Sequence, residues 1–569
     1  MNSSHPSNSI YKNTNTRPGS DLRFDLGILG GRIVDGAGNP WFYADLGVSG
    51  KNIAKVGKID KRDCRKTIDA EGLYVCPGFI DIHTHSDITA LVFPGCDSTL
   101  RQGVTTHLIG NCGMSAVPMR EPYIDTWKNY WGEWAGKFDE AGWKTFADYL
   151  RSLEKQGIGH NIAALVGHGA VRTAVLGPQR RAPNPAELKL MKNLVREAME
   201  AGAFGMSTGL VYPPGSFAKT GEIVELCKVV AEYGGMYTSH IRGERETIAT
   251  AIKEAILIGE RSGCRVEISH NCPKYGAWGR TKETLGLVEA ARKRGLAVTV
   301  DNDMHTDLAP SLSGALPQYL QELTKKEILK HIHSRANRDR IKKEIVEDKL
   351  PAYGPSGLLK HGAFDRIFLM HCPKQKKLEG KTVAQVAKVR GKSAFETYFD
   401  LMEEEKDEII AIFDYISEDD IQKLFMSPLV MVSSDCATWS ETGPMTDPPP
   451  YIPCAFGEFP GIIERYVRDE PIMTLQEGIK KMTSYPAQTI GLYDRGLLRP
   501  GMKADITIID LKRIKDRATN RWPHKYPFEN YPHRYPQGIP YVIVNGTVAV
   551  EKEKQLNVLP GEVLKHRPR

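Results

Sequence analysis

The chain has 569 residues, of which 41% are hydrophobic, 25% charged and 8% aromatic. This is ordinary globular composition at a length well beyond one small core, so a peptide, a disordered chain and a minimal binding module are excluded. The formal net charge is +7, and the 12 Lys and Arg against 5 Asp and Glu between Leu511 and Arg569 account for all of it. The main body is therefore neutral and lacks the basic stripe that a nucleic-acid groove needs.

The N-terminal residues 1–22 are polar and predict a disordered tail. They lack the apolar stretch of about 7 to 15 residues that a signal peptide needs. No run of about 18 apolar residues occurs anywhere, so we expect no membrane span. The ten cysteines show no repeated Cys-x-x-Cys spacing, which is typical of a reduced protein. We therefore expect a cytoplasmic protein whose partners include neither nucleic acid nor a membrane.

Apolar β-rich runs alternate with helical patterns from residue 78 onward. The helical stretches 187–201 and 222–233, for example, carry apolar residues at three- and four-residue spacing. This alternation is typical of βαβ units in an α/β protein, and eight such strands predict a (β/α)₈ TIM-like barrel with its active site at the carboxyl ends of the strands. The predicted strands are 79–83, 105–109, 162–166, 204–207, 236–240, 266–270, 297–301 and 429–433.

Two further regions flank or interrupt the predicted barrel, which spans 78–488. The segment at about 303–428 is too long for one βα connection and carries charged helical stretches at 325–349 and 393–414, so it predicts a subdomain inserted after strand seven. Short β-like runs precede the barrel and return after it. We therefore expect residues 23–77 and 489–569 to form one small β-sandwich built from both chain ends.

Predicted strand one ends with His83 and His85. Residues i and i+2 of a strand point to the same side, so both imidazoles can face one point at the mouth of the barrel. Two converging imidazoles make half of a metal site. The alternative is that they are two polar residues closing a strand, with their nitrogens satisfied by backbone carbonyls.

Other strand ends supply further ligand types, namely Cys112, His240, His270 and Asp435. Each has an ordinary alternative: the cysteine as a buried small residue, the histidines as hydrogen-bonded structural groups, and the aspartate as a helix N-cap. Their joint occurrence at strand ends favours a metal site, because zinc accepts thiolate, imidazole and carboxylate together.

Several motifs then resemble the amidohydrolase superfamily and, within it, the N-acyl-D-amino-acid deacylase (D-aminoacylase) family. They are GFIDIHTHSD at 78–87, GVTTHLIGNCG at 103–113, GGMYTSHIRGE at 234–244, EISHN at 267–271 and VSSD at 432–435. The resemblance implies that Cys112, His240 and His270 hold the tighter Zn²⁺. It also implies that His83, His85 and Asp435 surround a second, weaker or empty site.

The resemblance implies hydrolysis of an amide C–N bond, with an N-acyl-D-amino acid as the default substrate. Zinc lowers the pKa of a bound water and polarises an amide carbonyl. Asp435 can take a proton from the attacking water and deliver it to the departing nitrogen, acting first as base and then as acid. We expect loss of Asp435 to lower kcat and loss of Cys112 to lower metal content.

The chain departs from the family where the substrate carboxylate would bind. The family commonly has a lysine two residues after the strand-six histidine, where this chain has Cys272, and a tyrosine after strand seven, where it has Asp303. Asp303 would repel an anion. Lys274 and Arg242 are the remaining candidates for an anion contact, with surface salt bridges as the alternative. His168 could line the pocket or could serve only the loop in which it lies.

These departures keep two other functions open. The same metal chemistry could hydrolyse a cyclic or carboxylate-free amide such as a hydantoin. A non-catalytic amidohydrolase-like assembly protein is a further class, but it would have no reason to keep all six candidate ligands. The number of metals bound and the formation of a homo-oligomer are left open by the sequence.

Overall fold

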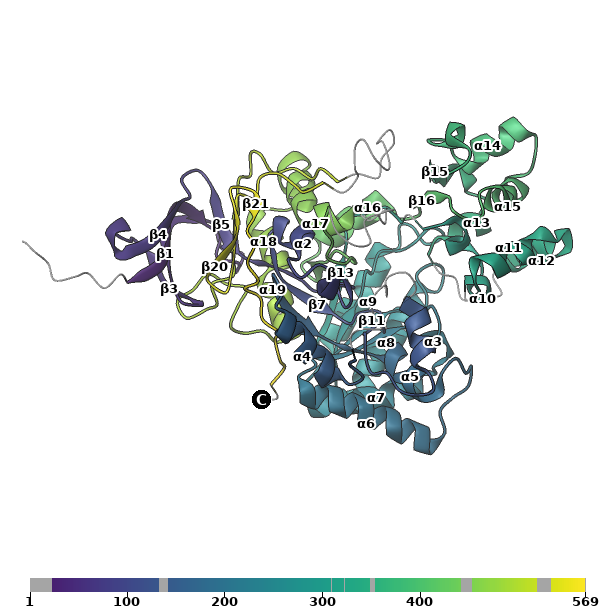
Figure 1. The fold of residues 1–569 in the computed structure, drawn as a ribbon, viewed down its shortest axis with the longest axis horizontal. Helices are drawn as coiled ribbons and strands as arrows, with labels where there is room; N and C mark the ends of the chain where they lie inside the picture. The colour runs from purple at the N-terminus through teal and green to yellow at the C-terminus, as the bar shows by residue number, and fades with distance from the viewer. Residues whose placement is uncertain are drawn as a thin grey trace, which may run out of the picture.

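A computed structural model describes residues 23–131, 142–308, 310–321, 323–347, 354–441, 453–518 and 534–567. Figure 1 shows a sheet at one end of the long axis, strands and helices in the centre, and a mainly helical region at the other end. The predicted tail at 1–22 lies outside the described residues. Within the described ranges, no helix is both long and apolar enough to cross a membrane.

The central strands pair in parallel, in chain order, and close into a ring. One sheet joins β6, β7 and β8, and a second joins β9 to β13 and β17. The N–H of Leu165 donates to Ile109 and that of Phe204 to Ala164, both at 2.9 Å, which connects the two sheets. A parallel bridge between Thr84 and Cys436 joins the last strand to the first.

The predicted alternation of parallel strands and helices is confirmed, but the third predicted strand is broken at Leu165. The strands are β6 (Phe79–Asp81), β7 (Val104–Ile109), β8 (Asn161–Ala164), β9 (Val166–Gly167), β10 (Gly205–Gly209), β11 (Met236–His240), β12 (Arg265–Ile268), β13 (Val298–Asn302) and β17 (Val430–Val432).

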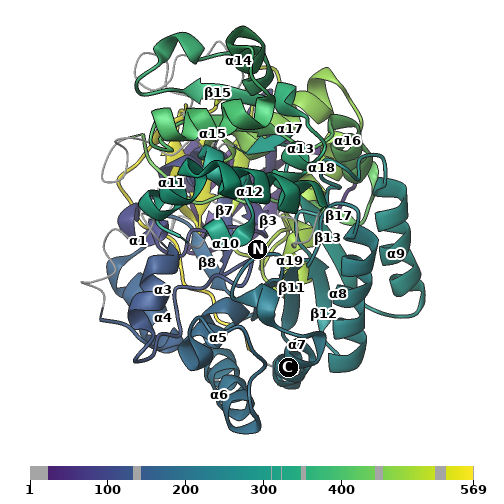
Figure 2. The ribbon, with the colours of Figure 1, turned by 90° about the vertical axis from the view of Figure 1, so that its right-hand side faces the viewer.

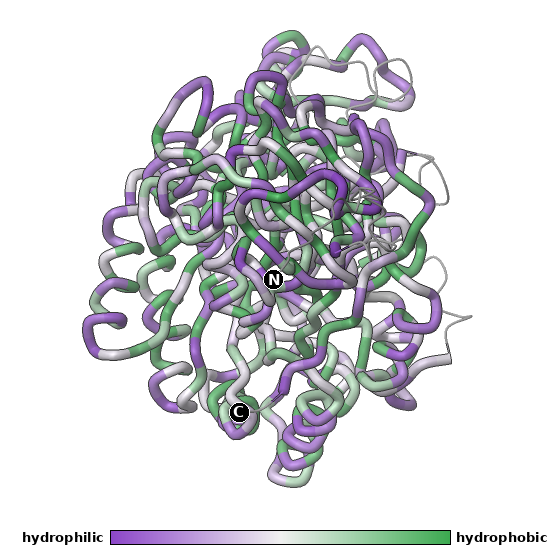
Figure 3. The backbone as a smooth tube through the Cα atoms, turned by 90° about the vertical axis from the view of Figure 1, so that its left-hand side faces the viewer, coloured by the Kyte–Doolittle hydropathy of each residue, from purple (hydrophilic) through white to green (hydrophobic). Residues whose placement is uncertain are grey.

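Helices cover the outside of these strands. In Figure 2, α8 and α9 lie outside β12 and β13, and Figure 3 shows hydrophobic segments gathered in the interior. All residues of β7, β10, β11 and β13 are buried, as expected for parallel strands covered on both faces. The helices are α1 (Thr89–Val92), α2 (Asp97–Arg101), α3 (Ile124–Trp131), α4 (Phe146–Gln156), α5 (His168–Leu176), α6 (Pro185–Ala201), α7 (Thr220–Glu232), α8 (Ile248–Ser262), α9 (Thr281–Lys293), α16 (Glu418–Met426), α17 (Cys454–Ile462), α18 (Leu475–Met482) and α19 (Ser484–Ile490).

Both chain ends contribute to one nine-stranded sheet, in the order β21-β20-β19-β18-β5-β1-β2-β3 with β4 beside β1. Antiparallel pairing of β5 with β18 joins the two ends. The nine strands are hydrogen-bonded into one continuous sheet. The two facing layers that a β-sandwich requires therefore stay a prediction. The strands are β1 (Phe24–Ile33), β2 (Phe42–Ser49), β3 (Asn52–Gly57), β4 (Cys64–Asp69), β5 (Tyr74–Pro77), β18 (Ile506–Ile509), β19 (Tyr541–Val544), β20 (Thr547–Glu551) and β21 (Lys554–Gln555).

The region between β13 and β17 contains its own small sheet, β14-β16-β15, beside several helices. The helix predicted at 393–414 was wrong in its second half, because the chain takes left-handed backbone angles at Lys406 (φ 55°) and Asp407 (φ 54°) and continues as a strand. The elements are β14 (Asp307–Leu308), α10 (Gln318–Gln321), α11 (Lys325–His333), α12 (Arg335–Glu347), α13 (Ser356–Lys360), β15 (Ile367–His371), α14 (Val383–Arg390), α15 (Ala394–Glu404) and β16 (Ile410–Asp414).

Candidate active site

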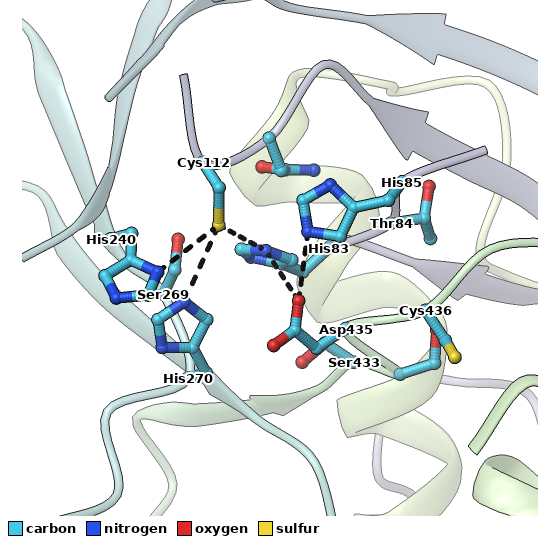
Figure 4. A network of polar contacts seen from close by, with 12 residues as sticks. His83, Thr84, His85, Cys112, His240, Ser269, His270, Ser433, Asp435 and Cys436 are labelled. Carbon is cyan, nitrogen blue, oxygen red and sulfur yellow. Dashed lines mark hydrogen bonds and ion pairs between the residues drawn. The ribbon is translucent and has the colours of Figure 1, made fainter. Parts of the chain in front are cut away.

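The sulfur of Cys112 lies among three histidines at the carboxyl ends of the strands (Figure 4). Its Sγ is 3.2 Å from Nε2 of His83, 3.6 Å from Nδ1 of His240 and 3.6 Å from Nε2 of His270. Cys112 follows β7, His240 ends β11 and His270 follows β12. The structure thus brings one thiol and three imidazoles from four strands to a single point.

Asp435 completes this cluster from the last strand. Its Oδ1 is 3.1 Å from Nε2 of His85 and 3.3 Å from Nε2 of His83. The ligand atoms of His83, His85, Cys112 and Asp435 lie within 4.8 Å of one another, as do those of Cys112, His240 and His270. All six residues predicted to hold metal therefore meet in one cluster.

The prediction that His83 and His85 lie on one face of a strand was wrong, because β6 ends at Asp81, before either histidine. They are held instead by the closure of the ring. The N–H of Asp435 donates to the carbonyl of His83 at 3.1 Å, and the N–H of His85 donates to the carbonyl of Cys436 at 2.8 Å.

Three residues of the cluster have left-handed backbone conformations, with φ of 53° at Cys112, 35° at His270 and 49° at Asp435. Such angles are uncommon for residues other than glycine and mark sites where the surrounding structure fixes the chain. Each strand therefore turns sharply at its end, and the turn directs the side chain into the mouth of the ring.

Charge in the cluster favours the ionised thiol and carboxylate. Burial opposes ionisation of Cys112, but the charge of His83 and hydrogen bonds from His240 and His270 hold its pKa well below the usual value. Burial likewise opposes ionisation of Asp435, and the contacts with His83 and His85 hold its pKa well below the usual value. A thiolate, a carboxylate and imidazoles form the mixed donor set that zinc accepts.

Two acidic residues that were not predicted as part of the site lie close to the histidines. Oε1 of Glu244 is 3.5 Å from Nε2 of His240 and 3.6 Å from Nδ1 of His270. Oδ2 of Asp301 is 3.4 Å from Nδ1 of His83. Asp301 ends predicted strand seven, so its position at a strand end was an available signal. Glu244 lies four residues beyond His240, where β11 ends, and had no such signal.

Lys274 and Asp303 lie beside the cluster. Nζ of Lys274 is buried, 4.0 Å from Oε1 of Glu244 and 5.5 Å from the ring centroid of Tyr415. Burial lowers the pKa of Lys274, but Glu244 and other acidic groups including Asp303 and Asp435 outweigh this effect and raise it. Burial raises the pKa of Asp303, although Lys274 opposes this change.

The other two predicted pocket residues contact groups away from the cluster. Arg242 pairs with Glu254 at 2.9 Å and also donates to the carbonyl of Ala218. His168 is buried, with Nε2 3.0 Å from Oε1 of Glu222. None of the contacts described for these two residues reaches Cys112 or Asp435.

A ring of parallel strands with such a ligand cluster at its carboxyl ends has the architecture of a barrel enzyme with a candidate metal site. The chain matches the model of the Amidohydrolase family over residues 66–550, and it belongs to this family. It is an enzyme that hydrolyses carbon–nitrogen bonds other than peptide bonds.

This chain is similar to curated relatives along nearly its whole length. A D-aminoacylase of Alcaligenes xylosoxydans xylosoxydans is 32% identical, with 95% of this chain and 97% of the relative covered. An N-acyl-D-glutamate deacylase of the same organism is 31% identical, with the same shares covered. The predicted resemblance to D-aminoacylases is confirmed.

Solved structures support a metal cofactor. An N-acyl-D-glutamate deacylase from Bordetella bronchiseptica, solved with zinc and a phosphonate inhibitor, has a TM-score of 0.73 at 30% identity, covering 95% of this chain and 100% of that chain. A D-aminoacylase with a binuclear metal centre has a TM-score of 0.72 at 30% identity over the same shares. A D-hydantoinase from Thermus sp. has a TM-score of 0.54 at 15% identity, with 95% of this chain and 99% of that chain covered. This last likeness shows the fold alone, so the cyclic-amide alternative is not favoured.

Proposed function

We propose that this enzyme is a zinc-dependent deacylase of N-acyl-D-amino acids. The observation that carries the proposal is the convergence of Cys112, His240 and His270 with His83, His85 and Asp435 in one cluster. The relatives named D-aminoacylase and N-acyl-D-glutamate deacylase support the substrate class.

The cluster fits zinc by its donor chemistry. Cys112, His240 and His270 would hold the tighter ion, and His83, His85 and Asp435 would surround the weaker one. When bound, zinc lowers the pKa of a water ligand and polarises an amide carbonyl. The possible ligand atoms form two groups that share Cys112, one with His240 and His270 and one with His83, His85 and Asp435, which supports two adjacent metal sites.

Asp435 is the proton carrier in this proposal. Its carboxylate takes a proton from the attacking water and gives it to the amide nitrogen as the C–N bond breaks. His83 and His85 hold one of its oxygens, which keeps the carboxylate turned into the cluster. Its low pKa keeps it ionised before the reaction, so it starts as the base.

Lys274 would contact the α-carboxylate of the substrate, since its buried Nζ lies beside the cluster, 4.0 Å from Oε1 of Glu244. Asp303 would disfavour an acidic side chain on the same substrate, because two carboxylates in one pocket repel. Arg242 and His168 are weaker candidates for substrate contacts, because Glu254 and Glu222 already occupy their charged or polar ends.

We further propose the domain division 23–77 and 489–569 for the end sheet, 78–488 for the barrel, and 303–428 for the insertion.

A cytoplasmic location is supported by ten cysteines that are all free thiols. Small amides are the partners in this proposal, and the oligomeric state is decided by light scattering of the purified protein.

Hydrolysis assays with paired N-acetyl-D- and N-acetyl-L-amino acids test the proposal. The panel contains free-carboxylate, amide-capped and cyclic versions, each assayed with the zinc-loaded protein. We expect turnover of free-carboxylate D-substrates. Turnover confined to capped or cyclic amides would contradict the proposed substrate, and loss of zinc without loss of turnover would contradict the proposed chemistry.

A further inference from the structure

Oε1 of Glu244 lies within 3.6 Å of a ring nitrogen of both His240 and His270. Nδ1 of His240 is directed at the sulfur of Cys112, at 3.6 Å, while its Nε2 is 3.5 Å from Oε1 of Glu244. In His270 the two nitrogens exchange roles, because Nε2 is 3.6 Å from the sulfur and Nδ1 is 3.6 Å from the same carboxylate oxygen. Each imidazole thus lies between the thiol and Glu244.

This arrangement selects one tautomer of each ring. A nitrogen that binds a metal carries no proton, so the neutral imidazole carries its proton on the other nitrogen, which donates to an acceptor. Oε1 of Glu244 lies 3.5 Å from that nitrogen in His240 and 3.6 Å from it in His270. Nε2–H of His240 and Nδ1–H of His270 would therefore share one acceptor oxygen.

Glu244 is itself fixed by Lys274. The side chain of Glu244 is only 6% exposed, and Nζ of Lys274 lies 4.0 Å from the same Oε1. The backbone N–H of Lys274 also donates to the carbonyl of Glu244 at 3.0 Å. Two imidazole nitrogens and one ammonium thus lie within 4.0 Å of a single carboxylate oxygen, and this arrangement of donors favours the ionised acid.

We propose that Glu244 is a positioning residue that fixes the tautomers of His240 and His270 for metal binding and connects the metal cluster to Lys274. The inference rests on the proposed function, which makes Cys112 and the two histidines metal ligands. It predicts that changes at Glu244 alter metal affinity first, and that substrate recognition changes with it because Lys274 loses its partner.

Zinc affinity tests this role without any substrate. Competition with a chromophoric chelator gives the dissociation constant for the wild type, Glu244→Gln and Glu244→Asp. We expect Glu244→Gln to bind zinc about 10- to 100-fold more weakly, the usual effect of removing a partner of a metal-binding histidine. Glu254→Gln is the matched control, since Glu254 is a partly buried acid that pairs with Arg242 instead, and we expect wild-type affinity there.

Glu244→Asp keeps the charge but shortens the reach, so we expect weaker zinc binding in a protein that stays folded by circular dichroism. If Glu244→Gln does not fold, the zinc affinity of Glu244→Asp tests the role of Glu244 in its place. Wild-type zinc affinity in a folded Glu244 variant would overturn the inference. A wild-type protein that binds no zinc would instead overturn the proposed function itself, whereas inactivity on N-acyl-D-amino acids with normal zinc binding would leave the role of Glu244 intact.

Discussion

Asp435 is the residue whose replacement separates proton transfer from metal binding. In the Asp435→Asn variant, the new side-chain amide can still accept hydrogen bonds from His83 and His85, but it cannot take a proton. We expect kcat to fall at least about 100-fold, the lower end of a general acid–base contribution, while the zinc held by Cys112, His240 and His270 stays bound. Steady-state kinetics and metal analysis of the same preparation check this, and near-normal turnover would remove Asp435 from proton transfer.

Lys274 is the residue that we expect to bind the carboxylate of the substrate. At saturating zinc, we expect Lys274→Met to raise KM for free-carboxylate substrates roughly 10- to 100-fold, since a hydrogen bond to a charged group contributes about 1.5 to 3 kcal/mol. Amide-capped substrates should show no comparable change. Arg242→Met is the control, because Arg242 pairs with Glu254. Equal effects on free and capped substrates would show that Lys274 does not contact the carboxylate.

The candidate ligands could be predicted from the sequence because the ends of parallel strands meet at one edge. His240 and Asp435 illustrate this, since their strands lie far apart in the chain but in one ring. Glu244 could not be assigned in the same way. Its role depends on which nitrogen of each histidine faces it, and that orientation is set by the turns after the strands.

The helix α6 begins with a pair of reciprocal hydrogen bonds between Asn184 and Glu187, which cap its first turn. The side chain of Asn184 accepts from the N–H of Glu187 at 2.9 Å, and Glu187 accepts from the N–H of Asn184 at 2.7 Å. We expect Asn184→Ala to lower the free energy of unfolding by about 1 kcal/mol, the usual contribution of an N-cap. Denaturant unfolding measures this.

Asn193→Ala is the matched control for the cap, because Asn193 is an exposed residue within the same helix. Surface substitutions of this kind usually change stability by less than about 0.5 kcal/mol. An equal loss in both variants would mean that the cap at Asn184 has no special contribution.

Elements with a clear period were predictable, and those decided by tertiary pairing were not. Residues 222–233 carry the helical spacing and form most of α7. By contrast, β16 continues a helical pattern in the sequence but pairs with β14 and β15. Its strand is decided by the left-handed turn at Lys406 and Asp407 and by neighbours far away in the chain.

For the whole molecule, Glu246 connects the barrel to the inserted region. Its Oε1 lies 2.8 Å from Nζ of Lys360 and 3.2 Å from Nε2 of His361. Burial favours the protonated acid, but the hydrogen bond from Lys360 outweighs this and lowers the pKa of Glu246 to about 2. The unfolded value is about 4.3, so this contact stabilises the folded protein fully above about pH 5 and loses its effect as the pH falls towards 2.

Acid should therefore loosen the attachment of the insertion before the barrel unfolds. The side chain of Glu246 is 38% exposed, so solvent screening limits its contribution to below about 1 kcal/mol. We expect Glu246→Gln to speed amide hydrogen exchange in α13, which contains Lys360, at pH 7. In the wild type, exchange in α13 should become faster between pH 5 and pH 3 after correction for intrinsic exchange rates, and this increase should be smaller in Glu246→Gln. Glu283→Gln is the control, because Glu283 pairs with Arg280. Equal exchange in α13 for the wild type and Glu246→Gln at every pH would show that other contacts hold the insertion to the barrel.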